Sequence, residues 1–470
     1  MKKYILPLLF ILCLTGLTAF SITDYTFGYK IPTSDVRSMS MGGTGVAFGE
    51  RPMDAFINPA VLMNLEIGYW AQMSVNGSQF MDKRSFPYFD SFEGYVDEAT
   101  YVTNFNYNAD IFGTIAWIYD IAPGKLAIGA RYAPVYDFNG FYKEQIRNNN
   151  NSNNDGYPER ITDNEINNEG FLNGFSFDLG YAMDIDTAFL TNLGIALEIT
   201  SLMGDVNQET RIEWTDWAIV QSPADTLQNF YYKNERDLSG LQYKAGLTTE
   251  LGDRFTLGFT YTAKTAIDVT SNVDKYLQNT VIDTSGLYLQ TNLNMDASDS
   301  LLFADYDLPS SMRFGFSYRP RNIMKTKING EAEYVLWSEL NDMYEDGWNY
   351  HLGVEHHVTN MIPIRFGFSS ETSYQTIFDD DGMYVQKLTM PSITAGTGYA
   401  IMKNLNLDFA LTYSFREYEA LDLFPDTFYY AGHTYLWPNT HIAISDRDWS
   451  NPDKVKEALV KANLSFTFKY

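Results

Sequence analysis

Segments in which apolar side chains alternate with small or polar ones recur along most of this chain. The stretch GFSFDLGYAMD covers residues 174–184, and the same period of two returns at 255–262 and 404–415. Successive side chains of a β-strand point to opposite faces, so each segment should form a strand with one apolar and one polar face. The alternation therefore predicts an all-β fold.

A soluble β-sandwich shows the same alternation, but three features favour a membrane barrel. The segments run to about ten residues, enough to cross a bilayer at a tilt, whereas ordinary strands average about five or six. Their polar face is rich in Gly, Ser, Thr and Asp, which suits a lumen. Short connections such as DIAPG at 120–124 alternate with long polar ones at 138–172, 203–237, 270–310 and 417–460, as in outer-membrane barrels.

In hydrocarbon every backbone N–H and C=O group needs an internal partner, so a sheet can span a bilayer only if it closes on itself. We therefore predict that residues 67–470 form a transmembrane antiparallel β-barrel of about 14 strands with long extracellular loops. Residues 283–293 are assigned to one of those loops rather than to an extra strand. The alternating C-terminal sequence ANLSFTFKY is typical of the last strand of such barrels, through which the barrel-assembly machinery is expected to bind.

The first 21 residues predict a secretory signal peptide. Lys2 and Lys3 precede an apolar stretch at 4–17, and small residues follow it. The only cysteine, Cys13, lies within this segment, so the mature chain is expected to contain no disulfide. No later run reaches about 18 apolar residues, the length of a transmembrane helix.

The composition also fits an outer-membrane protein. Aromatic residues make up 16% of the chain, including 34 Tyr and 32 Phe, and the two interfacial girdles of a barrel would use them. The net charge of −26 argues against nucleic acid as a partner, because phosphates require Lys and Arg. We expect a location in the outer membrane of a diderm bacterium, in contact with its lipids.

Residues 22–66 precede the first predicted strand and are predicted to form a hatch that plugs the lumen. A barrel of about 14 strands is too wide for its own side chains to fill, so an open one would leak. Gly42, Gly43 and Gly45 permit positive φ and close backbone approach. The stretch DAFINPAVL suggests a helical turn that ends at Pro59. A nucleotide-binding loop does not fit the glycines, because no Lys-Ser/Thr ending follows them.

The sequence RSMSMGGTGVAF, followed by DAFINPAVL, resembles the hatch of the FadL/OmpP1/TodX family of long-chain fatty acid transporters. In that family an Asn-Pro-Ala sequence closes the plug, which corresponds to Asn58, Pro59 and Ala60 here. The stretches LPSSMRFGFSYRP, GEAEYVLWSEL, NYHLGVEHHV and IRFGFSS, within 308–370, follow the family's order of strand motifs. Residues 77–310 match only in the rhythm of their strands.

The resemblance implies passive uptake of a hydrophobic small molecule, such as a long-chain fatty acid or an aromatic hydrocarbon, by a monomer without cofactor or metal. In the family the ligand is captured by outer loops, enters the barrel and leaves sideways through a gap at a kink in the third strand, under control of the hatch. The third strand here contains KLAIGARYAPVYDF, and we hypothesise that Pro134 marks the kink. The alternative is that Pro134 ends the strand near the outer rim.

Apolar side chains in the third and fourth predicted outer loops are candidates for ligand capture, because soluble surfaces rarely cluster such residues. If exposed, they would otherwise be a liability. These candidates are Trp214, Trp217, Phe230, Leu301, Leu302 and Phe303. The alternative is that the loops pack on each other as a cap.

Weaker signals concern charged groups. The predicted lumen face of one strand carries three potential metal ligands, His351, Glu355 and His357. Solvated polarity of the lumen is favoured over a metal site there. The acidic stretch at 378–384 lacks the twelve-residue calcium pattern and is expected to be a solvated loop. Arg37 and Glu50 in the hatch are expected to pair with charges on the lumen wall.

Three other functions remain open for such a chain. Relatives with this N-terminal region serve protein secretion, where the barrel would hold a client or a lipid. An outer-membrane enzyme would need a nucleophile, but no Gly-x-Ser-x-Gly motif is present and no Ser/His/Asp set stands out among the five His. An ordinary diffusion porin would conduct ions with the hatch in place, which measurements in planar bilayers would reveal.

Overall fold

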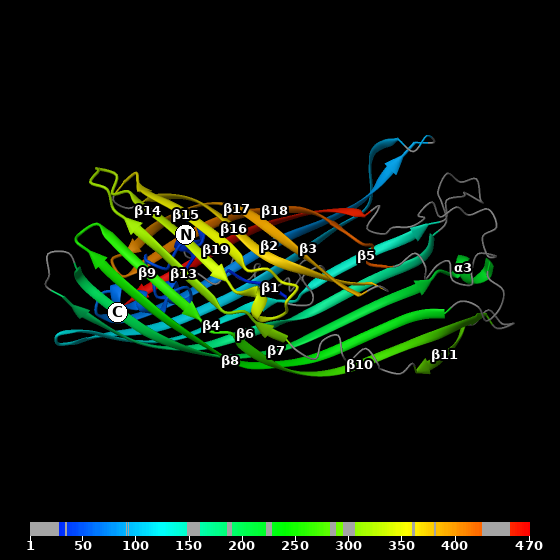
Figure 1. The fold of residues 1–470 in the computed structure, drawn as a ribbon, viewed down its shortest axis with the longest axis horizontal. Coiled ribbons are helices and arrows are strands. Elements are labelled where there is room, and N and C mark those ends of the chain that lie inside the picture. The colour runs from blue at the N-terminus through cyan, green and yellow to red at the C-terminus, as the bar shows by residue number, and fades with distance from the viewer. Residues whose placement is uncertain are drawn as a thin grey trace, which may run out of the picture.

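The computed structural model describes residues 28–470 apart from 33–34, 91, 93, 148–159, 186–189, 222–227, 283–287, 295–305, 360–361, 380–381 and 425–451. The chain forms a closed antiparallel barrel of 14 strands, as predicted. The barrel closes where β19 (Asp453–Lys469) pairs with β2 (Gly68–Phe89). The C-terminus and helix α3 (Asp216–Gln221) lie at opposite ends of the barrel (Figure 1). Among the described residues, no helix is both long and apolar enough to cross a membrane.

The strands of the wall differ widely in length. After β2, those of the first half are β3 (Tyr95–Ile121), β4 (Gly124–Asp137), β5 (Gly140–Arg147), β6 (Arg160–Asp184), β7 (Leu190–Trp214), β8 (Gln228–Leu251), β9 (Phe255–Thr262) and β10 (Thr265–Ile282). Those of the second half are β13 (Ser311–Tyr318), β14 (Lys327–Val335), β15 (Gly347–His357), β16 (Pro363–Asp379), β17 (Gly382–Met402), β18 (Leu405–Ala420) and β19. Segments β4 and β5 together occupy one strand position of the wall, because both pair with β6. Segments β9 and β10 likewise share one position beside β8.

Several stretches predicted as loops are strands. Strands β6, β7, β8 and β10 extend into the segments 138–172, 203–237 and 270–310. Two short strands, β11 (Tyr288–Asn294) and β12 (Tyr306–Leu308), also pair with β10, so the assignment of 283–293 to a loop was wrong for β11. Outside the bilayer both faces of a strand meet water or a polar lumen. The alternation is lost there while the backbone ladder continues.

The direction of the side chains confirms the period-two pattern of the sequence. On β6, Phe177 is 52% exposed whereas its neighbour Asp178 is 0% exposed. Exposed apolar residues also occur at alternate positions along β3, β7, β16 and β18. A soluble protein would bury the rings and expose the carboxylate. The apolar face of the wall therefore points to lipid, and the polar face points to the lumen.

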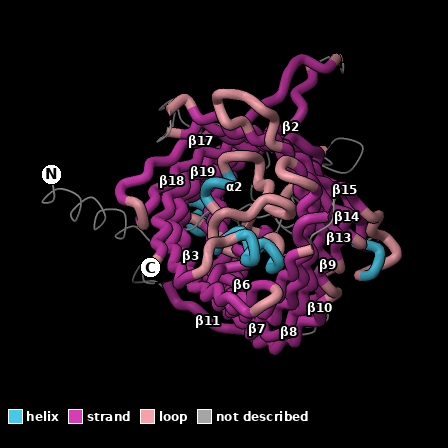
Figure 2. The backbone as a smooth tube through the Cα atoms, turned by 90° about the vertical axis from the view of Figure 1, so that its left-hand side faces the viewer, coloured by secondary structure: helices cyan, strands magenta, loops and turns pink. Residues whose placement is uncertain are grey.

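The N-terminal segment lies inside the barrel, as the view along the barrel shows (Figure 2). It contains β1 (Tyr29–Lys30), helix α2 (Val36–Met39) and two 3₁₀ helices, η2 (Pro52–Phe56) and η3 (Pro59–Asn64). Helix α2 contacts β17 and β18, whereas η3 contacts β6, β7 and β8. The segment thus reaches across the lumen from one side of the wall to the other.

Candidate functional site: the hatch and the lumen cavity

The glycines of the hatch allow its backbone to contact the wall directly. Gly42 and Gly43 have positive φ of 71° and 73°, which L-residues with a side chain rarely adopt. A Cβ atom on Gly42 would lie 2.4 Å from the carbonyl oxygen of Phe368 on β16. On the wall, a Cβ on Gly367 would lie 2.0 Å from the Gly42 amide nitrogen. Glycine is therefore required on both sides of this contact.

Asn58 connects the second half of the hatch to the wall. Its side-chain oxygen accepts a hydrogen bond from Ala60 N at 3.0 Å and caps η3. Its amide group donates to the carbonyl oxygens of Val46 at 2.6 Å and Leu247 at 3.2 Å. Pro59 begins η3 rather than ending a helical turn, because proline fits the first position of a helix. The single predicted turn is therefore two short helices joined at Asn58.

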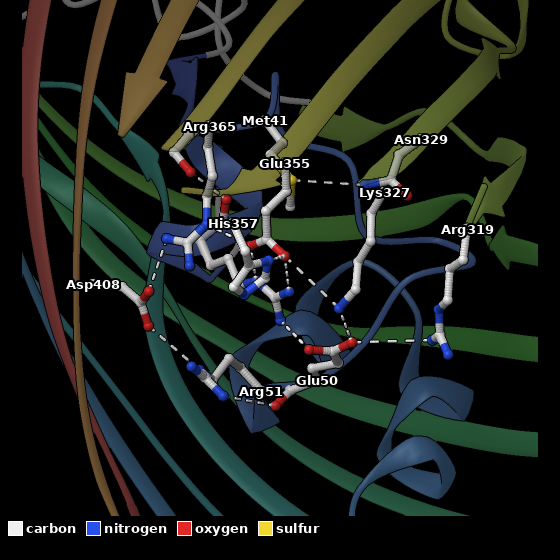
Figure 3. A network of polar contacts seen from close by, with 12 residues as sticks. Met41, Glu50, Arg51, Arg319, Lys327, Asn329, Glu355, His357, Arg365 and Asp408 are labelled. Atoms are coloured by element: carbon white, nitrogen blue, oxygen red, sulfur yellow. Dashed lines mark hydrogen bonds and ion pairs between the residues drawn. The ribbon is translucent and has the colours of Figure 1, made fainter. Parts of the chain in front are cut away.

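A network of buried charges fixes the first half of the hatch (Figure 3). Glu355 on β15 accepts hydrogen bonds from Arg37 at 2.8 and 2.6 Å and from Arg365 on β16 at 2.7 Å. Asp408 on β18 accepts from Arg365 at 2.8 Å and lies 3.4 Å from Arg51 of the hatch. Both carboxylates are almost fully buried. Removing one partner of such a buried pair costs about 3–5 kcal/mol.

Glu50 extends this network to β14. Its carboxylate accepts from Arg37 at 2.5 Å and forms a short ion pair with Lys327. Burial disfavours the ionised form, but the charges of Arg37 and Lys327 outweigh it and hold the pKa of Glu50 well below its usual range. The expected pairing of Arg37 and Glu50 with lumen charges is therefore present, and the two also pair with each other.

Two of the three potential metal ligands on β15 have hydrogen-bond partners in the protein. His351 donates from Nδ1 to the carbonyl oxygen of Gly42 at 2.8 Å, and Glu355 is held by two arginines. In the described part of the chain, no three His, Cys, Asp or Glu side chains gather as a metal site would require. Instead, both residues contact the hatch.

A cavity of about 240 Å³ lies between the hatch and the outer part of the lumen. Hatch residues Met39, Gly42 and Gly43 form part of its lining. Its wall is mixed, with ionic groups beside apolar and aromatic ones. The ionic residues are Lys30, Lys244, Arg313, Glu333, Glu371, Arg416 and Lys461, and the apolar or aromatic ones include Tyr29, Ile31, Val135, Tyr136, Leu308 and Met390. Such a lining suits a molecule with a large apolar part.

The third wall strand loses one neighbour near Pro134. Pairing between β3 and β4 ends at Gly113 and Tyr132. Pairing between β4 and β6 continues past Pro134 with a register shift before Tyr136. Strand β1 of the hatch pairs with the end of β4. Pro134 therefore lies inside the strand and does not end it at the rim.

The predicted capture residues fall into two groups. Trp214 was expected on an exposed loop, but it ends β7 and is only 5% exposed. Its ring lies in an apolar cluster with Tyr142, Ile161 and Phe424, against which Trp217 and Phe230 pack. Leu301, Leu302 and Phe303 lie outside the described residues, as do all side chains of 378–384. The backbone at 378–379 and 382–384 belongs to β16 and β17 rather than to the expected loop. Apolar character alone could not distinguish a buried cluster from an exposed one.

Sequence reasoning missed the partners that fix the hatch. Arg365, Lys327 and Asp408 were not singled out, and Glu355 was noted only as lumen polarity or a metal ligand. The sequence could have indicated these residues as lumen-facing, because each is a charged residue on the polar face of an alternating strand. Their pairing could not be deduced, because Arg37 and Glu355 are 318 positions apart.

The fold and the site define an outer-membrane β-barrel closed by an N-terminal hatch. A family model described as "Outer membrane protein transport protein (OMPP1/FadL/TodX)" matches residues 33–422, and the chain belongs to this family. Membership places it among transport proteins of the bacterial outer membrane. The comparison with curated protein sequences gives no match.

Solved structures share this fold at low sequence identity. A Pseudomonas aeruginosa FadL homologue is 16% identical with a TM-score of 0.55, covering 94% of this chain and 99% of its own. The P. putida toluene transporter TodX is 14% identical with a TM-score of 0.56, covering 95% and 99%. The Ralstonia pickettii toluene transporter TbuX is 17% identical with a TM-score of 0.50, covering 95% and 99%. At such low sequence identity, these comparisons show a shared fold alone.

Proposed function

We propose that this protein takes up hydrophobic compounds across the outer membrane and releases them sideways between β3 and β4. The observation that carries the proposal is the cavity that extends from the hatch to Val135 and Tyr136, beside the interrupted ladder. A ligand in this cavity would reach the wall without passing the hatch. Two solved relatives are named as toluene transporters, which supports a hydrophobic ligand.

Pro134 is the residue we assign to the lateral gap. Proline has no N–H to donate and is excluded from continuous central strands. The two ladders around it behave differently, since the β6 side continues and the β3 side stops. A solute that leaves here enters lipid directly, so its apolar surface is not exposed to the periplasm.

The hatch controls this route in our proposal. Strand β1 pairs with Tyr136 and Asp137 at the end of β4, next to the gap. The same segment is anchored further along by Arg37 and Glu355. Movement of residues near β1 could therefore open the gap while the ion pairs keep the remainder of the hatch in place.

Capture at the outer end remains part of the proposal. Trp217 and Phe230 are only partly buried and border the apolar cluster around Trp214. A hydrophobic ligand could replace part of their mutual packing at little cost, because apolar contacts are non-directional. Long-chain fatty acids and aromatic hydrocarbons are the two ligand classes to compare.

Replacement of Pro134 tests the proposal. Pro134→Val restores an N–H and favours strand conformation, so the ladder to β3 should extend and the gap should narrow. Initial uptake of radiolabelled oleate and toluene would be measured in cells that lack their own transporters. We expect uptake of the transported class to fall about tenfold, as expected when passage through an opening limits the rate.

Pro87→Val is the matched control, because Pro87 also lies in a ladder with register shifts nearby but does not line the cavity. It should leave uptake unchanged. Uptake by the Pro134 variant equal to wild type would contradict lateral release at this position. Wild-type cells that accumulate neither compound above the empty-vector level would contradict the transport proposal itself.

A further inference from the structure

The outer half of the β16–β17 hairpin stands apart from the wall at both edges. The ladder between β15 and β16 ends at Tyr350 and Ser370, and the ladder between β17 and β18 ends at Ser392 and Ser414. Within the described residues, the strand portions from Glu371 outward therefore pair only with each other. The wall is interrupted on each side of this hairpin.

Three aromatic rings cover the edge next to β15. The segment after β14 includes the 3₁₀ helix η5 (Trp337–Glu339) and returns to β15. Trp337 and Tyr344 pack on Tyr374 of β16, with ring centroids 5.2 and 5.1 Å away, and lie 6.4 Å from each other. We call these three residues the aromatic latch. Tyr344 and Tyr374 are buried in this contact.

Polar contacts supplement the latch where the ladder is missing. The side-chain oxygen of Asn349 accepts a hydrogen bond from the Thr372 amide at 2.8 Å. Tyr374 donates its hydroxyl to the carbonyl oxygen of Glu345, and Lys387 donates to that of Asp346 at 3.2 Å. Each such bond contributes only about 0.5–1.5 kcal/mol net. Opening this edge therefore breaks no backbone ladder.

The latch borders the same cavity as the β4 interruption. Trp337 and Tyr374 line the cavity at one place, and Val135 and Tyr136 line it at another. The opposite edge of the hairpin differs, because Glu417, Glu419 and Lys454 line the depression there. Lys387 also lines it, although its ammonium group reaches Asp346 on the latch side. Apolar solutes are attracted to aromatic faces, whereas charged groups would have to lose water to admit them. Of the two edges, the aromatic one suits a hydrophobic ligand.

We propose that the aromatic latch is an entry site for hydrophobic solutes, which bind between Trp337 and Tyr374 before they reach the cavity. Tyr350, Phe368 and Met343 near it are each more than 40% exposed on the outer face. Such rings belong at the membrane interface. The latch therefore lies at the interfacial layer, and a solute captured at the outer end of the barrel passes it on the way to the cavity. This entry site rests on the transport function proposed above.

A reversible bridge across the latch tests the site. Trp337→Cys and Tyr374→Cys are combined in the full-length chain, whose only other cysteine is Cys13 in the predicted signal peptide. A short bis-methanethiosulfonate then links the two thiols in intact cells. Initial uptake of a fluorescent fatty acid and of a neutral aromatic dye is measured before and after bridging. We expect bridging to lower uptake about tenfold and a reductant to restore it, as for a closed gate.

Tyr334→Cys with Trp348→Cys provides the matched control. These two residues are direct partners across β14 and β15, and their rings lie 4.8 Å apart. Neither lines the cavity. Bridging them should leave uptake unchanged. A general effect of the reagent or of stiffening this part of the wall would lower uptake in both variants and would overturn the inference.

The remaining outcomes separate the entry site from the transport function. If the latch bridge leaves uptake at the unbridged level while Pro134→Val still reduces it, the entry site is refuted and transport stands. If wild-type cells take up neither probe, transport fails and the entry site fails with it.

The double substitution is judged to prevent folding if the protein loses its heat-modifiable migration on gels. In that event a single substitution is used instead. Tyr374→Cys alone is then labelled with a bulky maleimide that fills the latch. The label should reduce uptake as strongly as the bridge, and unchanged uptake after complete labelling would refute the entry site. The unlabelled variant serves as its own control.

Discussion

The inner and outer parts of the lumen are filled by different chemistry. Around the hatch, Arg37, Glu355, Arg365 and Asp408 form buried ion pairs with hydrogen-bond geometry. Towards the α3 end, apolar side chains such as those of Ile161 and Phe424 form a buried cluster, and the buried pair of Arg84 and Asp82 lies beside it. The two regions have the same barrel around them, so the difference reflects what each must do.

Ion pairs of this kind are directional, and a buried charge without its partner is costly. They fix the hatch in one position against the wall. Apolar contacts lack direction, and a well-packed cluster tolerates exchange of one hydrophobic group for another of similar volume. The outer cluster can therefore rearrange around a hydrophobic ligand, while the hatch remains fixed until its pairs are broken.

The largest effect should come from Glu355→Gln, which keeps the shape of the side chain and removes its charge. Arg37 and Arg365 would then be buried without their shared carboxylate. The docked hatch should lose about 3–5 kcal/mol of stability. Hydrogen exchange of the hatch amides, measured by mass spectrometry, reports this loss.

Glu98→Gln is the control for that substitution, because Glu98 pairs with Lys454 and Lys456 near the outer surface. Exposed pairs contribute about 0–1 kcal/mol. Equal hatch exchange in the two variants would show that the buried pairs do not hold the hatch.

Asn58→Ala should have an intermediate effect. The variant loses the cap of η3 and leaves the carbonyl oxygen of Val46 without its 2.6 Å donor. Loss of a cap and of one buried bond together should cost about 2 kcal/mol. The exchange rate should rise around η3 first. If α2 is affected equally, the hatch behaves as one cooperative unit and the division into two anchors is wrong.

In the outer cluster, Ile161→Leu should cost less than about 1.5 kcal/mol, because it conserves apolar volume in a non-directional environment. Ile161 is fully buried, so the substitution examines packing alone. Thermal unfolding followed by loss of strand signal gives the value. A cost as large as that of Glu355→Gln would remove the contrast between the two regions.

The smallest effect concerns pH. The folded hatch lowers the pKa of Glu50 below its usual 4.5, so the stabilisation from this group is complete above that pH and is lost as pH falls through the lowered pKa. The difference in hatch stability between wild type and Glu50→Gln should therefore shrink below about pH 4.5. A difference that stays constant down to the acid limit would contradict ion pairing of Glu50.

The barrel could be predicted because the alternation of side chains is a local property of each strand. A compact hatch could also be predicted from Gly42, Gly43 and Asn58, because the backbone conformations that these residues favour depend on short local motifs. Other features depend on distant partners. Trp214 looks like an exposed loop residue until Phe424 and Tyr142 are known to pack in the same cluster. The ends of the strands were missed because ladder hydrogen bonds do not depend on side-chain polarity.

Conductance of the intact chain in planar bilayers tests the central claim most directly. If the hatch closes the lumen through the Arg37–Glu355 pair, the folded protein should insert without a steady ion current. A constant ohmic conductance through intact, unmodified barrels would mean that the lumen is open, and it would contradict the account.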